Sequence, residues 1–272
     1  MNIHIKNLLK NIVPRRLLIF ISNSFQYKSF KGNFKNFDEV KSLVTNYDSN
    51  KIINKVLKAY KNSEKSSYLI DRDGEILKKK NQNFQLLNEM THIINKSKFN
   101  CVIDYGGSLA NFVRNNKNYL RKYNIVWIVI DNERICSLGK KIIKTDNIYF
   151  FDNLNKAYQF ILKKNLIVNF FLFGSSIQYI QGFEKILKKI RLLNVRNIVI
   201  DRQPVLRNKT TKYAIQKIPF WVGNFSYAVK LYKSQSLINM FIKNGYFLVN
   251  RLNAFGDQFK DGEYKSFIFK QR

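Results

Sequence analysis

Cysteine and histidine are scarce in this sequence. Cys101 and Cys136 are the only cysteines among 272 residues, and neither belongs to a C-x-x-C pair or a spaced Cys/His set. The sequence therefore predicts no zinc site and no disulfide framework, and it fits a reducing compartment. His4 lies in a basic N-terminal segment and His92 in a predicted helix, which argues against a histidine general base. No spacing of Asp and Glu distinguishes metal ligands, so no metal is expected.

Long apolar runs are missing from the N-terminal segment. Its longest unbroken run, Leu17–Ile21, is far too short to cross a bilayer, and no small-residue cleavage site follows it. Residues 1–30 are basic and apolar in turn, which leaves two interpretations open. The segment is either a helix docked on the domain or a helix resting on an anionic membrane surface. The expected location is the cytoplasm, with peripheral contact at the inner face of the membrane under the second interpretation.

Acidic residues are also few: 18 Asp and Glu stand against 48 Lys and Arg, a formal net charge of +30. Such an excess is typical of proteins that bind nucleic acid or anionic membranes. The lysines are, however, spread along the whole chain, and Asn, Ile, Phe and Tyr are abundant while Gly (11) and Pro (3) are rare. This bias is typical of AT-rich coding sequences. Because no nucleic-acid-binding motif is present, nucleic acid is not the expected partner.

The first third of the chain is predicted to be helical. Hydrophobic residues make up 45% of the chain and aromatic residues 15%, enough for a substantial core. Apolar residues at helical spacing predict two short helices within residues 38–60 and a third over about 83–95, with a loop around Asp71–Gly74 between them. No strand pattern is visible here, so we interpret residues 1–98 as an N-terminal helical cap and residues 99–272 as the main domain.

From Asn100 onward, strands alternate with helices, which predicts an α/β, Rossmann-like parallel sheet with crossover helices. The early strands are apolar runs without polar alternation, as expected for strands covered on both faces. The predicted strands are Cys101–Tyr105, Ile125–Asp131, Ile148–Phe151, Phe170–Gly174 and Asn197–Asp201.

The end of the chain predicts an antiparallel hairpin. A helix over Ser234–Lys243, ending at Gly245, precedes two β-rich runs, Tyr246–Asn253 and Lys265–Lys270, which flank the polar loop Gly256–Glu263. Five parallel strands and such a terminal hairpin together make a mostly parallel, seven-stranded sheet. This is the arrangement of class I S-adenosylmethionine-dependent methyltransferases. Nicotinamide enzymes usually continue in parallel.

A glycine turn follows the first predicted strand. Gly106 and Gly107 lack a Cβ, so the backbone there can approach a nucleotide-like ligand closely, and a helix beginning near Leu109 would point N–H groups at it. A plain strand-to-helix turn is the alternative. The usual methyltransferase turn alternates acid-x-Gly-x-Gly-x-Gly, whereas here Ser108 and Ala110 occupy the second and third glycine positions. Either residue would be strained if its position required a positive φ.

Several short motifs share their order and spacing with a known family. They are Tyr47-Asp48-Ser49, Arg72-Asp73, Asp104 to Leu109, Trp127 ahead of Asp131, Ser175 to Tyr179, Asp201-Arg202 and Gln216 to Pro219. From about Phe30 to Phe255 the chain resembles methyltransferases often encoded with surface-polysaccharide (O-antigen or capsule) biosynthesis. The resemblance implies a class I methyltransferase fold and S-adenosylmethionine as cofactor.

The residues then suggest a cofactor site. Asp104, with the turn residues Gly106, Gly107 and Ser108, would hold the amino-acid portion of S-adenosylmethionine. Asp131, ending the second strand, would accept hydrogen bonds from the ribose hydroxyls. Asp152 would contact the adenine amine, and Ser175, after the fourth strand, would lie beside the transferred methyl group. Asp131 and Asp152 could equally be ordinary loop carboxylates, and Ser175 a helix cap.

The acceptor side is built from later segments. Asp201 is the preferred general base and Tyr179 the second candidate. Residues that would bind the acceptor are Ser176, Gln178, Arg202 and Gln216. Arg202 suits an anionic group such as a nucleotide-sugar phosphate or an acidic sugar. Two alternatives stay open: Gln178 satisfies backbone groups, and Asp201 and Arg202 form a structural ion pair.

The sequence thus predicts an S-adenosylmethionine-dependent O-methyltransferase whose acceptor is a sugar or a nucleotide-linked sugar. No Asp-Pro-Pro-Tyr-like segment follows the fourth strand, which argues against methylation of base amino groups. A non-catalytic binding protein with a methyltransferase-like fold and a nucleic-acid methyltransferase are the alternatives.

Overall fold

The computed structural model describes residues 30–44, 50–66, 68–72, 74–78, 83–94, 100–218, 225–259 and 261–272. The expected N-terminal helix within residues 1–30 lies outside these ranges, apart from Phe30 itself. The motif residues Tyr47-Asp48-Ser49, Asp73 and Pro219 also lie outside them. No helix among the described residues is long and apolar enough to span a membrane.

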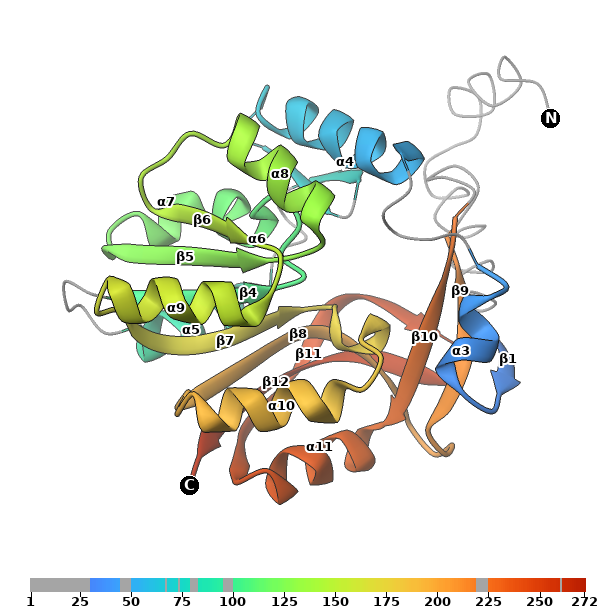
Figure 1. The fold of residues 1–272 in the computed structure, drawn as a ribbon. Helices are drawn as coiled ribbons and strands as arrows, with labels where there is room; N and C mark the ends of the chain where they lie inside the picture. Colours follow the sequence, from blue (N-terminus) through green and yellow to red (C-terminus); the bar gives the residue numbers. More distant parts are fainter. Residues whose placement is uncertain are drawn as a thin grey trace, which may run out of the picture.

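A central sheet organises the chain (Figure 1). Its order is β6-β5-β4-β7-β8, with the first four neighbouring pairs parallel, followed by β12 antiparallel to β8 and by β11 at the edge. These strands are β4 (Asn100–Tyr105), β5 (Ile125–Ile130), β6 (Ile148–Phe151), β7 (Ile167–Gly174), β8 (Asn197–Leu206), β11 (Tyr246–Phe259) and β12 (Gly262–Gln271). The class I methyltransferase fold expected from the sequence is therefore confirmed by the strand order and directions.

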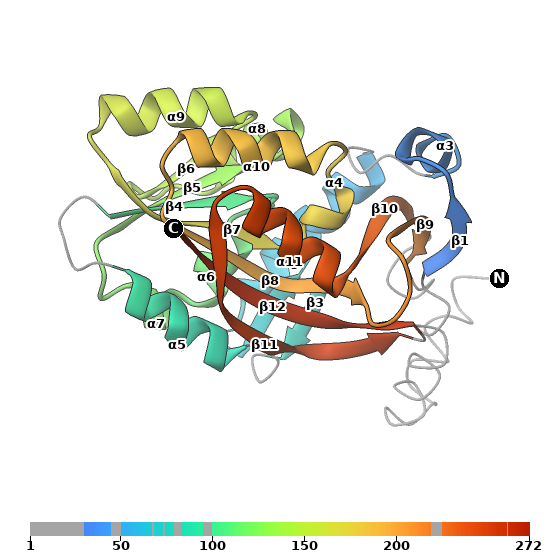
Figure 2. The same ribbon diagram turned by 90° about the horizontal axis from the view of Figure 1, so that it is seen from below.

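Helices cover both faces of this sheet (Figure 2). On one face lie α9 (Leu154–Lys163), α10 (Phe183–Leu192) and α11 (Ser234–Lys243), whose apolar sides share one core with the strands. The other face is covered by α4 (Asn50–Ser63), α5 (Phe84–Ile93), α7 (Lys117–Leu120) and α8 (Glu133–Ile142). Because β4 is buried on both faces, its apolar run needs no polar alternation.

The structure also contains strands that the sequence pattern did not predict. β9 (Lys212–Lys217) and β10 (Ser226–Lys233) form an antiparallel pair, which β1 (Phe30–Phe34) extends and α3 (Phe37–Lys41) covers. β10 joins the main sheet beside the end of β8, at Val205 and Leu206. The strand β8 therefore runs five residues past its expected end at Asp201.

The expectation that residues before 99 contain no strand is wrong. Besides β1, this region forms a hairpin of β2 (Leu69–Arg72) and β3 (Glu75–Lys78) where a loop was expected. Gly74 takes a φ of +82° in its turn, which suits glycine. The polar loop expected at 256–263 is also shorter, since β11 continues to Phe259 and β12 begins at Gly262. The proposed domain boundary at residue 98 stays a prediction.

A buried arginine ties the β2–β3 hairpin to the main domain. Arg114, in the short helix α6 (Asn111–Asn115), contacts Glu64 at 2.8 Å and Asp71 at 3.4 Å, and its guanidinium lies over the ring of Tyr60. The Asp71 side chain is fully buried, whereas Glu64 is about half exposed. The Asp71 contact is therefore the one that matters for stability.

We predict that Arg114→Ala lowers the free energy of unfolding by about 3–5 kcal/mol, because it leaves the Asp71 carboxylate buried without its cation. Adding Asp71→Asn to this variant should recover part of the loss. The control is Lys156→Ala, which breaks an exposed ion pair with Asp152 and should cause no measurable change. Urea unfolding curves compare the variants, and an Arg114→Ala curve superimposed on wild type would contradict the assignment.

Candidate functional site

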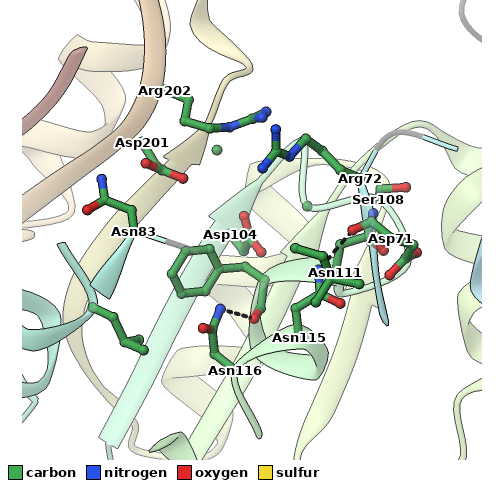
Figure 3. A pocket seen from close by; sticks show the side chains of 16 residues that line it. Asp71, Arg72, Asn83, Asp104, Ser108, Asn111, Asn115, Asn116, Asp201 and Arg202 are labelled. Carbon is green, nitrogen blue, oxygen red and sulfur yellow. Dashed lines mark hydrogen bonds between the residues drawn. The ribbon is translucent and has the colours of Figure 1, made fainter. Parts of the chain in front are cut away.

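A cavity opens where the carboxyl ends of β4 and β7 and the middle of β8 meet the β2–β3 hairpin and α6 (Figure 3). This is the edge of the sheet at which open α/β folds bind ligands. The cavity is lined by Ile70, Asp71, Arg72, Asn83, Leu87, Asp104, Gly106, Gly107, Ser108, Asn111, Phe112, Asn115, Asn116, Gly174, Asp201 and Arg202. Six residues predicted from the sequence thus share one cavity: Asp104, Gly106, Gly107, Ser108, Asp201 and Arg202.

The turn after β4 has the backbone of an alternating glycine motif. Gly106, Ser108 and Ala110 all take positive φ values, of 75°, 51° and 54°. Ser108 and Ala110 are therefore strained, as anticipated if these positions required a positive φ, because only glycine adopts this region freely. The helix α6 begins at Asn111, two residues later than expected, and spans only five residues. Its N-terminus consequently adds little to ligand binding.

The two glycines are required by the protein's own packing. A Cβ at Gly107 would lie 2.6 Å from the carboxyl carbon of Asp104, and one at Gly106 would lie 2.7 Å from Cβ of Ser176. The turn is thus pressed against the ends of β4 and β7. The absence of side chains in the turn keeps this arrangement compact whether or not a ligand is bound.

Asp104 is buried beneath the turn. Its Oδ2 accepts a hydrogen bond from Nε1 of Trp127 at 3.1 Å. Burial raises the pKa of Asp104 from the ordinary 3.8 to about 7; the Trp127 bond opposes this rise, and the negative charge of Asp131 adds to it. Asp104 is therefore a carboxyl group that exchanges its proton near neutral pH, at the floor of the cavity.

Asp131 lies behind the turn and is not among the residues lining the cavity. Its Oδ2 accepts from the backbone N–H of Ser108 at 2.9 Å, and its Oδ1 accepts from the backbone N–H of Asn132 at 2.7 Å. Nδ2 of Asn132 also donates to Oδ1, at 3.1 Å. These bonds hold the turn in place.

Asp201 and Arg202 enter the cavity through a β-bulge. Gln203 pairs with Lys265 and Ile200 pairs with Phe267, so Asp201 and Arg202 together oppose the single residue Ser266. Arg202 has a φ of +51°, unusual for a residue with a long side chain. In a regular strand two successive side chains point to opposite faces, but here both line the same cavity.

Ser266, which is fully buried, organises this bulge. Its hydroxyl donates to Asp201 Oδ1 at 2.9 Å and accepts from the backbone N–H of Arg202 and from Nδ2 of Asn83, each at 3.3 Å. The carboxylate of Asp201 is thereby oriented by a hydroxyl group. Among the described residues, Asp201 and Arg202 form no ion pair with each other, so the structural-pair alternative is wrong.

Other predicted residues make contacts outside the cavity lining. Tyr179 donates a hydrogen bond to Oε1 of Gln216 at 2.7 Å, so the structure brings these two together. Ser176 donates to the carbonyl of Tyr105 at 2.7 Å, and Gln178 is buried and donates to the carbonyl of Ser175 at 2.7 Å. Both side chains therefore donate to backbone carbonyl groups, which for Gln178 was the open alternative to binding the acceptor. None of these side chains is among those lining the cavity.

Asp152 lies at the surface after β6. It accepts from Nζ of Lys156 at 2.7 Å, and this bond lowers the pKa of its carboxyl group. It is not among the cavity residues either. Its contacts in this structure are those of an ordinary loop carboxylate, which was the alternative. The predicted contact of Asp152 with adenine stays a prediction.

Some cavity residues were not predicted from the sequence. Arg72 was noted only as part of a motif, and Asn83 and Asn111 carried no recognisable pattern. The Asp-Gly pair at 73–74 was a signal that could have located the hairpin that delivers Arg72. Ser266, which supports the cavity from behind Asp201, was also missed, because its contact with Asp201 joins residues 65 positions apart.

The cavity has features that fit a cofactor such as S-adenosylmethionine. Oγ of Ser108 is buried at the cavity wall and has no hydrogen-bond partner among the described residues. A buried hydroxyl without a partner is unfavourable, and a ligand could satisfy it. Asp104 offers a carboxyl group for a cationic ligand, and the positive-φ turn presents its backbone.

Comparisons with known proteins give structural likeness only. No family model and no curated protein matches the sequence. Among solved structures, the chain is similar to the CcbJ methyltransferase from Streptomyces caelestis (12% identity, TM-score 0.45, 69% of this chain and 88% of that one).

A methyltransferase from Clostridium acetobutylicum, described as S-adenosylmethionine-dependent, gives 10% identity and a TM-score of 0.46 over 72% of this chain and 92% of that one. A methyltransferase from Mesorhizobium loti, also described as S-adenosylmethionine-dependent, gives 7% identity and a TM-score of 0.44 over 68% of this chain and 96% of that one. Because identities and TM-scores are this low, the fold assignment depends on the strand order described above.

The raised pKa of Asp104 predicts a specific pH dependence of stability. Between about pH 4 and pH 7 the unfolded chain releases the Asp104 proton while the folded protein retains it, so stability falls as pH rises through this window and then levels off. Relative to Asp104→Asn, the wild-type free energy of unfolding should fall by on the order of 3 kcal/mol between pH 4 and pH 8.

Chemical denaturation at several pH values measures this difference. Asp152→Asn is the control and should show no such change in this window, because the Lys156 bond lowers the pKa of Asp152. A wild-type minus Asp104→Asn difference that is flat with pH would show that Asp104 titrates normally.

Proposed function

We propose that this protein is an S-adenosylmethionine-dependent O-methyltransferase acting on a sugar or a nucleotide-linked sugar. The observation that carries the proposal is the meeting of a glycine turn, a buried carboxyl group and a second carboxylate in one cavity beside the carboxyl ends of β4 and β7. The strand order of the sheet supports it further.

The cofactor would lie across the turn after β4. S-adenosylmethionine supplies an electrophilic methyl group on a cationic sulfonium, and it carries an ammonium group at its amino-acid end. Asp104 is suited to the cationic end, and Oγ of Ser108 could hydrogen-bond the same portion. Asp131 and Asp152 end the neighbouring strands and are assigned to the ribose and the adenine. Ser175, which has a φ of +56°, lies at the end of β7, where the methyl group would be presented.

Asp201 is assigned as the general base that removes the proton of the acceptor hydroxyl. Methyl transfer is an in-line displacement in which positioning contributes most of the rate, so one oriented base suffices. The hydroxyl of Ser266 holds the Asp201 carboxylate at the cavity. Tyr179, bonded to Gln216, is the second candidate and would act only if the acceptor reached beyond the cavity.

The biological setting follows the sequence resemblance to proteins of surface-polysaccharide biosynthesis. We propose a cytoplasmic enzyme whose partner is a glycan precursor, with peripheral membrane contact through the basic N-terminal segment. The positive charge of the chain is compatible with such contact at an anionic bilayer.

A non-catalytic binding protein is the second candidate. It is favoured by one observation: the glycines of the turn are required by internal packing, and the next two positions of the motif are Ser108 and Ala110. A chain that had lost its cofactor could keep the same turn. Direct binding measurements separate the two candidates.

The test is isothermal titration of the full chain with S-adenosylmethionine, its demethylated product S-adenosylhomocysteine and NAD in parallel. We expect both S-adenosyl compounds to bind with micromolar affinity and NAD not to bind. Asp131→Ala should weaken binding at least tenfold, because the turn loses the acceptor of its Ser108 N–H. Asp146→Ala, an exposed carboxylate in the loop before β6, is the control and should not change binding. Absence of binding to wild type would overturn the cofactor assignment.

A further inference from the structure

Arg202 combines an unfavourable backbone conformation with a side chain that has no partner among the described residues. It is a half-buried residue with a positive φ inside a strand; its backbone N–H donates to Ser266, but its guanidinium makes no hydrogen bond or ion pair with any described residue. Strained backbone tends to persist at functional sites, where the surrounding structure enforces it. A bulge is a known way to re-aim a side chain. Here the bulge opposite Ser266 turns Arg202 into the cavity beside Asp201.

A second arginine reaches the same cavity from a different element. Arg72 is the last residue of β2 and lies opposite Glu75 in the hairpin. It is half-buried and lines the cavity with Arg202. Figure 3 shows the two guanidinium groups turned toward each other, on the side of the cavity away from Asn115 and Asn116. Two guanidinium groups that converge in a partly buried space create a positive potential, which favours an anionic ligand there.

The carboxyl groups that line the cavity have partners of their own. Asp71 contacts Arg114, Asp201 accepts from Ser266, and Asp104 lies under the turn against Trp127. The cavity therefore presents both carboxyl groups and two guanidinium groups to a ligand. Such a lining suits a cationic group at the turn, where Asp104 lies, and an anionic group at the arginines.

We propose that Arg72 and Arg202 together bind a phosphate group of the acceptor. Guanidinium groups bind phosphate oxygens in pairs of parallel hydrogen bonds, and two of them can engage a phosphate from two directions. This inference deepens the proposed function and rests on it: the acceptor is a phosphorylated sugar, nucleotide-linked or lipid-linked, and a neutral glycan is excluded. The phosphate would hold the sugar beside Asp201, the neighbour of Arg202 in the bulge.

The experiment uses isothermal titration of the full chain with inorganic pyrophosphate, the group common to both sources. We expect saturable binding at one site to wild type and at least a tenfold loss of affinity in Arg72→Gln and in Arg202→Gln. The control is Arg207→Gln, an exposed arginine just beyond β8 that is not among the cavity residues; it should bind like wild type. Equal pyrophosphate affinity in all four proteins would overturn the proposal.

A second titration separates this proposal from the cofactor assignment. S-adenosylmethionine should bind both arginine variants as tightly as it binds wild type. If its affinity falls as much as that of pyrophosphate, the arginines hold the carboxylate of the cofactor and the proposal is wrong. If wild type binds pyrophosphate through the two arginines but does not bind S-adenosylmethionine, the anion site stands and the proposed methyltransferase function fails.

Two further ligands distinguish the source of the phosphate. Uridine diphosphate should compete with pyrophosphate if the acceptor is nucleotide-linked, and farnesyl diphosphate in detergent should compete more strongly if it is lipid-linked. Competition by neither would overturn the assignment to a phosphorylated sugar.

Arg202→Gly tests whether the strain serves binding. Glycine adopts a positive φ without penalty, so the urea midpoint of this variant should not fall, while pyrophosphate binding should be lost. A purely structural role for Arg202 predicts the reverse, a lower midpoint with binding retained.

Discussion

The buried carboxyl group of Asp104 is the contact on which the geometry of the site depends. It receives the indole N–H of Trp127 from the neighbouring strand, and Gly107 lies directly against it, so no side chain can be added there. The turn above it is held from the other side by Asp131, which binds the N–H of Ser108. With these contacts made, the chain passes through three positive φ values within five residues. Gly106, Gly107 and Ser108 of this turn form one wall of the cavity.

The opposite wall depends on a second local distortion, in β8. There the register with β12 slips by one residue opposite Ser266, and two consecutive side chains enter the same cavity. One is the carboxylate assigned as general base, and the other is a guanidinium assigned to the acceptor. The hairpin that closes the cavity is secured by Arg114 and adds a second guanidinium, that of Arg72. Strain in the turn and in the bulge thus concentrates at one place, as is common in functional sites.

The parts of the fold predicted from the sequence are those whose signal is local. The strands β4 and β5 are apolar runs buried on both faces, and β6 is a short, partly buried apolar run. The approximate range predicted for α11, from its apolar spacing and the glycine that follows it, agrees with the structure. β1 and β9 were missed because they are short, half-polar strands, and their pairing with each other joins distant parts of the chain. The β2–β3 hairpin was missed because its apolar residues are few, although its Asp-Gly turn is a recognised hairpin signal.

The site was predictable to a similar degree. Motif spacing predicted Asp104, the glycine turn, Asp201 and Arg202 as site residues, and these do share a cavity. It could not decide between ligand contacts and local contacts for Gln178 and Asp152, because the residues that engage them, Ser175 and Lys156, lie only three and four positions away in the chain and both kinds of contact suit the same pattern. Nor could alternation along a strand predict that Asp201 and Arg202 face the same way, since a bulge breaks that rule.

Hydrogen exchange followed by mass spectrometry, with and without S-adenosylmethionine, tests the central claim most directly. The account predicts that the cofactor slows exchange in peptides covering the turn from Asp104 to Asn111, because binding there would order a strained backbone. Peptides from α10, on the far face of the sheet from α6, should exchange at the same rate in both conditions and serve as the internal control. Unchanged exchange in the turn at saturating cofactor, or protection confined to another part of the chain, would contradict the account.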